Sequence, residues 1–397
     1  MTHDTDLPQG YKATALGIIP QEWEVKFLGD LLSRCTNGLT YDVSITCGIP
    51  VTRIETISTG EINYAKVGYI PNESGYETFR MQKGDILYSH INSLSQIGKV
   101  AYYKGDKEIY HGMNLLLLRA NNCLDKQYLY YTLLTEHMRH MAQIIAKPAV
   151  NQASISTSDL KRVKIAVPPL AEQRKIAEVL GVWDEAIEKQ ARLIEKLALR
   201  KRGLMQRLLS AKLRLPGFSD PWKELKINKI TIIRKGEQVN KDVLFSNAKY
   251  PVINGGITPS GYLDIYNTKA NTITISEGGN SCGYVNFMTT PFWSGGHCYT
   301  IEAKDGINNL FIYQLLKNNE KYIMSLRVGS GLPNIQIKDL GNLKFMIPTY
   351  QEQTAIAEVL TASDREIELA KEKLERLRRQ KRGLMQQLLT GKKRVKY

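Results

Sequence analysis

Residues 168–212 read PPLAEQRKIAEVLGVWDEAIEKQARLIEKLALRKRGLMQRLLSAK, and residues 348–392 read PTYQEQTAIAEVLTASDREIELAKEKLERLRRQKRGLMQQLLTGK. The two stretches align without a gap, 180 positions apart, and 22 of their 45 positions are identical. A repeat of this length predicts a molecule built from two equivalent halves, each able to meet an equivalent partner.

Both copies carry one apolar stripe, in which the spacing alternates between four and three residues. A 3.5-residue period kept over about five heptads is typical of a coiled coil. About 42 helical residues would extend roughly 60 Å, and an apolar stripe of that length needs a partner. The stripe comprises Ile176, Leu180, Trp183, Ile187, Ile194 and Leu197 in the first copy, and Ile356, Leu360, Ile367, Leu374 and Leu377 in the second.

The simplest partner for each helix is the other copy. Gln190 would then face Ala370, and Trp183 would face Ser363, which suits packing of large against small side chains. An antiparallel pair would have a pseudo-twofold axis and would place the two intervening domains at opposite ends. The alternative is that each helix packs on its own neighbouring globular domain.

Each copy ends in a basic stretch with the shared core KRGLMQ, at residues 201–206 and 381–386. Such a run is commonly a solvated helix face. The repetition of a glycine and a methionine inside it instead favours a contact surface for another protein. The residues predicted to dock a partner are Lys201, Arg202, Met205, Lys381, Arg382 and Met385.

The length and charge of the chain narrow its class. At 397 residues it should form two or three domains, and a formal net charge of +15 favours a polyanionic partner, nucleic acid above all. The five cysteines are scattered and odd in number, which fits a reducing cytoplasm. The N-terminus lacks the pattern of a signal peptide, and no apolar run reaches the length of a membrane span.

Similar globular segments precede the two repeats, which predicts an α+β protein with two mixed α/β domains. The expected order is a domain at 1–167, a helix at 168–212, a second domain at 213–347 and a helix at 348–397. Strand-like runs occur in both domains, DILYS, GKVAYY and MNLLLLRA in the first and NTITIS, GYVNFM and CYTIEA in the second. A helical segment follows in each, with Tyr131 aligned to Tyr313, and then a turn that begins at Ile155 or Ile335.

The loops differ between the two domains, which is the pattern expected of two readers of different targets. Simple drift after the duplication would produce the same difference. Asn and Gln side chains can pair with adenine in the major groove, Arg with guanine, and basic or hydroxyl groups with phosphate. The same residue types also dominate ordinary turns. The candidate DNA-binding residues are Arg53, Ser89, Asn92, Lys147, Asn151 and Gln152 in the first domain, and Asn254, Asn280, Arg327, Asn334 and Gln336 in the second.

Motifs for catalysis are not found. The sequence contains no GxxxxGK[ST] phosphate loop, no HExxH, no GxSxG elbow and no kinase signature. Its six histidines show no metal-ligand spacing. The sequence therefore predicts a binding protein without a catalytic or metal site.

The repeat and the domain frames together resemble the DNA specificity subunit of type I restriction-modification systems, over essentially the whole chain. The pieces that carry the resemblance are PPLAEQRKIAEVL and its repeat, KRGLMQQLL, VTRIETISTGEIN, KGDILYSHINSLSQIGKVA, YPVINGG and TITISEGGNSCGYV. The first domain departs from the pattern, with Ala149-Val150-Asn151 where the second has Gly331-Leu332-Pro333-Asn334.

The resemblance implies two target-recognition domains held apart by an antiparallel pair of helices. Each domain would read one half of a split site in double-stranded DNA, and the helices would set the gap. It also implies two methyltransferase subunits docked on the helices and domain flanks, and two motor-nuclease subunits that join through them. S-adenosylmethionine, ATP and magnesium would belong to those partners, with no cofactor bound by this non-catalytic chain in the prokaryotic cytoplasm.

Other functions remain open at this point. The chain could serve a lone methyltransferase or a fused methyltransferase-nuclease, or it could be a basic coiled-coil scaffold that binds RNA or acidic proteins. A cryptic enzyme is disfavoured because the motifs are missing. If the helices act as a ruler, a four-residue insertion after Glu188 should change the recognised gap without changing either half-site.

Overall fold

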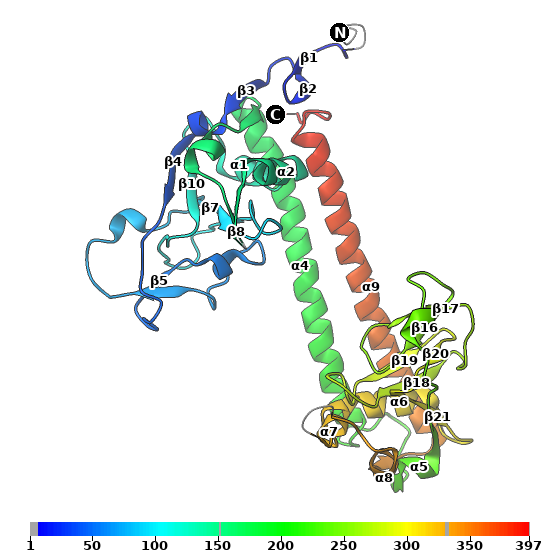
Figure 1. Cartoon of the computed structure of the whole chain (residues 1–397). Coiled ribbons are helices and arrows are strands. Elements are labelled where there is room, and N and C mark those ends of the chain that lie inside the picture. Colours follow the sequence, from blue (N-terminus) through cyan, green and yellow to red (C-terminus); the bar gives the residue numbers. More distant parts are fainter. Residues whose placement is uncertain (1–6, 151, 330–332, 397) are drawn as a thin grey trace. The chain divides into compact units, whose positions relative to one another are not determined.

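The computed structural model describes residues 7–150, 152–329 and 333–396, and the chain divides into two compact units. Unit 1 comprises residues 1–189 and 375–397, and unit 2 comprises residues 190–374. The repeated segments form two long helices, α4 (Leu170–Leu208) and α9 (Tyr350–Leu388), each of 39 residues (Figure 1). Each helix contributes one segment to each unit.

Unit 1 is built around an antiparallel sheet in the order β4-β10-β7-β9. Its strand β7 is apolar on both faces: Ile86 and Tyr88 lie in the main core, and Leu87 lies in a second apolar cluster. Successive side chains of a strand alternate between faces, so a strand covered on both sides must be apolar throughout. The described elements of unit 1 besides the two long helices are β1 (Tyr11–Thr14), β2 (Gly17–Pro20), β3 (Glu24–Phe27), η1 (Leu28–Leu31), β4 (Leu32–Asn37), β5 (Ile49–Val51), η2 (Ile54–Ile57), β6 (Gly68–Ile70), η3 (Glu77–Phe79), β7 (Ile86–Tyr88), β8 (Ile91–Asn92), β9 (Val100–Tyr102), β10 (Leu116–Ala120), α1 (Lys126–Leu133), α2 (Glu136–Ile145), β11 (Lys147–Ala149), β12 (Gln152–Ser154), α3 (Thr157–Lys161) and β13 (Lys164–Val167).

Unit 2 repeats this plan with an antiparallel sheet in the order β15-β21-β18-β19. In its strand β18, Ile273 and Ile275 face the core, while Thr272 and Thr274 are buried on the other face. The described elements of unit 2 besides the two long helices are β14 (Lys223–Lys226), α5 (Ile227–Ile230), β15 (Thr231–Lys235), η4 (Lys241–Val243), β16 (Tyr250–Ile253), β17 (Gly261–Leu263), β18 (Thr272–Ser276), β19 (Val285–Met288), β20 (Trp293–Ser294), β21 (Cys298–Ala303), α6 (Asn309–Asn318), α7 (Glu320–Ser325), α8 (Ile337–Asn342) and β22 (Lys344–Ile347).

The six strand-like runs of the sequence correspond to strands β7, β9 and β10 in unit 1 and β18, β19 and β21 in unit 2. The prediction that these runs form strands is confirmed. The predicted alignment of the following helices is wrong by one residue. The helix caps Asp125 and Asn308 are equivalent, because the backbone N–H of each donates to the first-turn glutamine of a long helix, Gln173 or Gln353, at 2.8 Å.

This cap places Tyr131 opposite Gln314 rather than opposite Tyr313. Tyr131 Oη donates to Asp184 at 2.7 Å, and Gln314 Nε2 donates to Asp364 at 2.8 Å, and these two aspartates occupy the same position of the repeat. The error arose because a tyrosine occurs at two successive positions of the first helix, and the sequence offers nothing to choose between them.

Both long helices contact each other within each unit. In unit 2, Gln190 Nε2 donates to the Ala370 carbonyl at 2.9 Å, so the predicted contact between these two residues is confirmed. The predicted contact of Trp183 with Ser363 is wrong, because the neighbouring aspartates of the two residues pair with Lys381 and Lys201. Further along α4, Lys201 Nζ lies 2.5 Å from Asp364 Oδ1. In unit 1, the repeat equivalent of this ion pair joins Lys381 to Asp184 at 2.5 Å. The same ion pair therefore recurs at both positions of the repeat.

The first turn of each long helix carries a buried glutamate that ties distant segments together. Glu172 in unit 1 is 0% exposed and accepts hydrogen bonds from the Trp23 indole at 3.0 Å and from the Arg394 guanidinium at 2.6 and 2.9 Å. In unit 2, Glu352 accepts from Trp222 at 3.1 Å and from Arg214 at 2.6 and 2.8 Å. A carboxylate near a helix N-terminus is also favoured by the helix dipole.

Candidate nucleic-acid interface

Four of the first-domain candidates lie around one small sheet of unit 1, in the order β11-β12-β8. Asn92 on β8 pairs with Ala153 on β12, next to Gln152, and Lys147 lies at the start of β11. Asn92 Nδ2 donates to Ser89 Oγ at 3.2 Å. Ser89 is only 1% exposed, so its hydroxyl holds Asn92, while Lys147 and Gln152 are exposed.

The other two first-domain candidates are not part of that group. Arg53 follows the strand β5, and its Nε lies 3.5 Å from Glu55 Oε2 with 38% of its side chain exposed. Asn151 lies outside the described residues. The structure thus brings together four of the six residues singled out in this domain.

Three second-domain candidates meet at the loop that follows β18. Asn334 forms a β-bridge with Gly278 of this loop, and Gln336 Nε2 donates to Asn334 Oδ1 at 3.0 Å. Asn280 is exposed on the same loop. Arg327 is exposed and directly precedes Val328, a second bridge partner of Asn334.

The fifth candidate of unit 2, Asn254, joins a charged cluster that sequence reasoning missed. Asn254 Oδ1 accepts from the His297 N–H at 3.0 Å, and the His297 carbonyl accepts from the Glu277 N–H at 2.9 Å. Glu277 is 8% exposed, and its Oε1 lies 2.7 Å from Lys235 Nζ and 3.0 Å from Tyr299 Oη. Burial and the Glu277 carboxylate both raise the pKa of the Tyr299 hydroxyl. The cluster has no local sequence pattern, because its members come from four separate strands or from residues next to them.

The backbone frame beneath these loops is the same in both units. The Gly98 N–H donates to the Ser89 carbonyl at 2.8 Å, and the Gly283 N–H donates to the Ser276 carbonyl at 2.8 Å. One residue further on, the His90 carbonyl accepts from the Ile155 N–H and the Glu277 carbonyl from the Ile335 N–H. His90 and Glu277 therefore occupy equivalent positions, with different chemistry on one frame.

Two histidines of unit 1 are buried beneath its loops. His90 is 5% exposed and His111 is 0% exposed, and the Nδ1 atom of each has no hydrogen-bond partner in the structure. His111 Nε2 lies 2.9 Å from the Leu115 carbonyl. Burial lowers the pKa of both imidazoles from 6.5 to about 4. Both rings are consequently neutral at neutral pH.

Unit 1 is therefore expected to lose stability on acidification. Between pH 6.5 and about 4 the unfolded chain binds a proton at each histidine and the folded chain does not, so the free energy of unfolding falls as the pH is lowered through this window. For the fully buried His111 the loss is on the order of 3 kcal/mol. Urea denaturation at about pH 5 and about pH 7.5 measures the change.

Matched variants separate this effect from general acid destabilisation. His111→Gln should flatten the pH dependence, whatever its effect on stability at neutral pH. His137→Gln, at an exposed position of α2, should leave the pH dependence as it is. Equal pH dependence in the parent and in both variants would show that His111 does not titrate as its burial requires.

Comparisons with known proteins decide the family. A family model described as the type I restriction modification DNA specificity domain matches residues 20–198 and again residues 219–379. The chain belongs to this family. It is a type I restriction-modification specificity subunit with two target-recognition domains.

Relatives and solved structures agree with this assignment. A Methanocaldococcus jannaschii protein, provisionally named type I restriction enzyme MjaX specificity subunit, is 36% identical over 98% of this chain and 97% of its own length. The EcoKI specificity subunit of Escherichia coli is 27% identical over 45% of this chain and 40% of its own length. The crystal structure of a type I system S subunit from M. genitalium has the same fold, with a TM-score of 0.64 and 21% identity over 98% of this chain and 99% of that one.

Most of the apolar stripe of this specificity subunit is buried. In unit 1, Ile176 and Leu180 of α4 share one apolar cluster with Met385 of α9 and with residues of the globular domain. Both expected partners of the helices, the other copy and the neighbouring domain, are thus in contact with α4 within this unit. The buried stripe residues are Ile176, Leu180, Leu197, Ile356, Leu360, Ile367 and Leu374, and the half-buried ones are Trp183, Ile187, Ile194 and Leu377.

The six residues predicted to dock a partner fall into two groups. Lys201 and Lys381 are held by the aspartate ion pairs, with 13% and 12% of their side chains exposed. Met205 and Met385 belong to the apolar cores of units 2 and 1. Arg202 and Arg382 are exposed. Within each unit, the arginines are the members of this set that a partner could reach.

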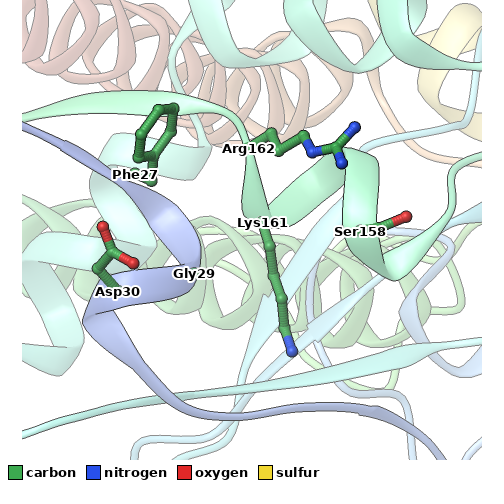
Figure 2. Close-up of a pocket in the computed structure, with 6 residues that line it drawn as sticks. All are labelled: Phe27, Gly29, Asp30, Ser158, Lys161 and Arg162. Atoms are coloured by element: carbon green, nitrogen blue, oxygen red, sulfur yellow. The ribbon is translucent and has the colours of Figure 1, made fainter.

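Each unit also has an open hollow near its first short helix. In unit 1 a hollow of about 630 Å³ is lined by two segments, residues 27–30 and 158–162 (Figure 2). In unit 2 a hollow of about 440 Å³ lies at the corresponding junction of α5 and α8. The described DNA-binding candidates line neither hollow. The lining residues in unit 1 are Phe27, Gly29, Asp30, Ser158, Lys161 and Arg162.

Three further features bear on chemistry. Among residues 7–150, 152–329 and 333–396, no group of three or more His, Cys, Asp or Glu side chains is placed to hold a metal ion. All five cysteines are free thiols. Within the same described part of the chain, no helix combines the length and the apolar character needed to cross a membrane.

Proposed function

We propose that this specificity subunit reads a split site in double-stranded DNA, one half with each target-recognition domain. The observation that carries the proposal is the shared backbone frame with different polar side chains at equivalent loop positions, His90 in one unit and Glu277 in the other. The repeated frame would give each domain an equivalent DNA-binding surface, and the different side chains on it would let the two domains bind different base sequences. The net charge of +15 supports binding to the phosphate backbone.

We propose further that α4 and α9 pair as an antiparallel coiled coil and that their length sets the gap between the half-sites. The contacts Gln190–Ala370 and Lys201–Asp364 in unit 2 support this pairing, because the partner number falls as α4 advances. The equivalent Lys381–Asp184 pair in unit 1 supports a pseudo-twofold relation. The predicted domain boundaries at residues 167, 212 and 347 remain part of this proposal.

The proposed partners are two methyltransferase subunits and two motor-nuclease subunits that join through them in the prokaryotic cytoplasm. This chain would be non-catalytic and would direct their methylation and cleavage, while S-adenosylmethionine, ATP and magnesium would bind to those partners. The exposed Arg202 and Arg382, at equivalent positions of the two helices, are the proposed docking contacts. Two equivalent contacts suit two copies of one partner.

A glycine beside each of these arginines offers a test of docking. A Cβ added at Gly203 or Gly383 would meet nothing within 4 Å, so the folded chain gives no packing reason for glycine inside these helices. Gly383→Ala is expected to raise the free energy of unfolding by about 0.5–1 kcal/mol, because alanine is the better helix former. If the methyltransferase approaches the helix closely there, its affinity should fall by about tenfold, or about 1.4 kcal/mol.

Calorimetry of binding to the purified methyltransferase, together with thermal unfolding, measures both effects. Gly181→Ala is the matched control, since it lies on α4 outside the basic stretch and its Cβ would approach only Tyr131 Oη, at 3.8 Å. A Gly383→Ala chain with raised stability and undiminished affinity would exclude docking at this face.

The proposed function is tested by single-molecule sequencing of methylated adenines. DNA from cells that carry this chain with its cognate methyltransferase is compared with DNA from cells that lack this chain. We expect a new split motif, two short specific halves around a fixed gap. An active methyltransferase without any new motif would favour a basic scaffold that binds RNA or acidic proteins. A split motif without restriction would favour a subunit that serves a lone methyltransferase.

A further inference from the structure

In unit 2, only one of the two oxygen atoms of the buried Glu277 carboxylate accepts hydrogen bonds. Its Oε1 atom accepts from Lys235 and Tyr299, whereas Oε2 is buried and has no hydrogen-bond partner in the structure. The Nδ1 atom of the His297 ring lies 3.6 Å from Oε2, beyond hydrogen-bonding distance. A buried charge is costly unless it is paired and hydrogen-bonded. A carboxylate kept under such conditions beside exposed loops indicates a role other than packing.

The sheet register explains why these groups converge. Lys235 on β15 pairs with Tyr299 on β21, and Tyr299 pairs with Ile275 on β18. Paired residues of neighbouring strands point to the same face, and Glu277 lies two residues beyond Ile275, so it points to that face as well. The cluster therefore sits where the core face of the sheet ends and the loops begin.

Exposure divides the cluster into an inner acceptor and outer donors. The side chain of Glu277 is 11% exposed, whereas those of Lys235 and His297 are 53% and 61% exposed. The ammonium group of Lys235 has three N–H donors and gives one to Glu277. The His297 ring turns Nδ1 toward the carboxylate, which leaves Nε2 on the opposite side of the ring. Glu277 thus holds Lys235 through a hydrogen bond and lies beside the His297 ring, and each of these two side chains has a nitrogen position that Glu277 does not use.

Unit 1 has different groups in this place. The equivalent positions of its sheet hold Asn37, Leu116 and His90, none of which is a carboxylate or a lysine. The set of donors held by an inner carboxylate thus belongs to unit 2. If the two units read different DNA sequences, we expect the difference to arise from side chains that differ at equivalent positions of the shared frame.

We propose, on the basis of the function proposed above, that Glu277 positions Lys235 and His297 as the donors with which unit 2 reads a guanine of its half-site. Guanine presents two acceptors, N7 and O6, in the major groove, and lysine is a common donor to them. Glu277 is a positioning residue that acts through its two neighbours. The candidates Asn254 and Asn334 flank the cluster through His297 and Ile335, which places them at the edge of the same reading surface.

The test is methylated-adenine sequencing with the complete chain and its methyltransferase, for the parent and for Lys235→Met, Glu277→Gln and His297→Gln. The parental motif should contain a guanine in one half-site. In Lys235→Met and Glu277→Gln, discrimination for that guanine should fall by about 5- to 100-fold. The other half-site and the gap should stay unchanged, since unit 1 and the helices are untouched.

Glu302→Gln is the matched control. Glu302 lies on β21, three residues beyond Tyr299, and forms an exposed ion pair at 2.8 Å with Arg234, the residue before Lys235. Both side chains of this pair lie on the opposite face of the sheet from the cluster. This variant should keep the parental motif. It removes a carboxylate from the same two strands without touching the proposed donors.

The outcomes distinguish the inference from the proposed function. A parent without a split motif removes the proposed function and the inference with it. A split motif that is the same in the parent and in the Lys235 and Glu277 variants overturns the inference and leaves the proposed function in place. A uniform loss of methylation with an unchanged motif also overturns it, because it assigns these groups to phosphate contacts or to stability. If Glu277→Gln fails to fold, the exposed-side-chain variant Lys235→Met decides.

Discussion

Arg394→Met is expected to lower the free energy of unfolding of unit 1 by about 3 kcal/mol. Arg394 donates two hydrogen bonds to Glu172, whose side chain is fully buried, and without it the carboxylate keeps only the Trp23 indole. Removing one partner of a buried ion pair typically costs about 3–5 kcal/mol, because it leaves a buried charge unpaired. The remaining indole hydrogen bond and the one-third exposure of Arg394 favour the lower end of this range.

Denaturant unfolding combined with hydrogen exchange resolved by segment measures this loss and assigns it to a unit. Arg378→Met is the control. Arg378 forms an ion pair with Glu375 on the surface of α9, and both side chains are about half exposed. An exposed pair contributes at most about 1 kcal/mol. Similar losses in the two variants would contradict the role assigned to the buried pair.

The repeat allows a second, independent check. Arg214 makes the same two hydrogen bonds to Glu352 in unit 2, so Arg214→Met should destabilise unit 2 and leave exchange in unit 1 unchanged. The double variant Glu172→Gln with Arg394→Met should recover part of the loss in unit 1, because it removes the stranded charge along with its partner.

Lengthening both long helices is expected to widen the gap of the recognised site by about three base pairs. Seven residues inserted after Glu188 in α4 and seven after Leu374 in α9 would keep the heptad phase and add about 10 Å to each helix. DNA advances about 3.4 Å per base pair. Both half-sites should keep their sequence, since neither globular domain is altered.

Methylated-adenine sequencing reads the gap directly. The same seven residues inserted after Asn247, in an exposed loop of unit 2, lengthen the chain without lengthening a helix and should leave the gap as it was. An unchanged gap in the helix variant, with both half-sites still read, would mean that α4 and α9 do not set the spacing.

The sequence by itself determined the elements whose signal is local or repeated. The apolar stripe and the prolines at 168 and 348 predicted both long helices, and both begin two residues after these prolines. The strand-like runs DILYS and NTITIS predicted β7 and β18, and the structure shows that the residues of both strands are buried. The same local signals, with the duplicated segment, were enough to indicate the family.

Two of the hydrogen bonds between candidate residues join near neighbours in the sequence. Asn334 and Gln336 lie two residues apart and are hydrogen-bonded to each other. Ser89 and Asn92 lie three residues apart and are also hydrogen-bonded to each other. Arg53 was predicted from its residue type alone, and it lies apart from the other described candidates of unit 1.

Only the tertiary structure decided which charged residues meet. Lys235, Glu277 and His297 come from three strand ends, and Glu172 and Arg394 are separated by 222 positions. The sequence does not show whether a carboxylate is solvated or buried, because its surroundings are formed by segments from elsewhere in the chain. Periodicity determines which face of an element is buried, whereas strand order and register determine which polar groups share the edge of that face.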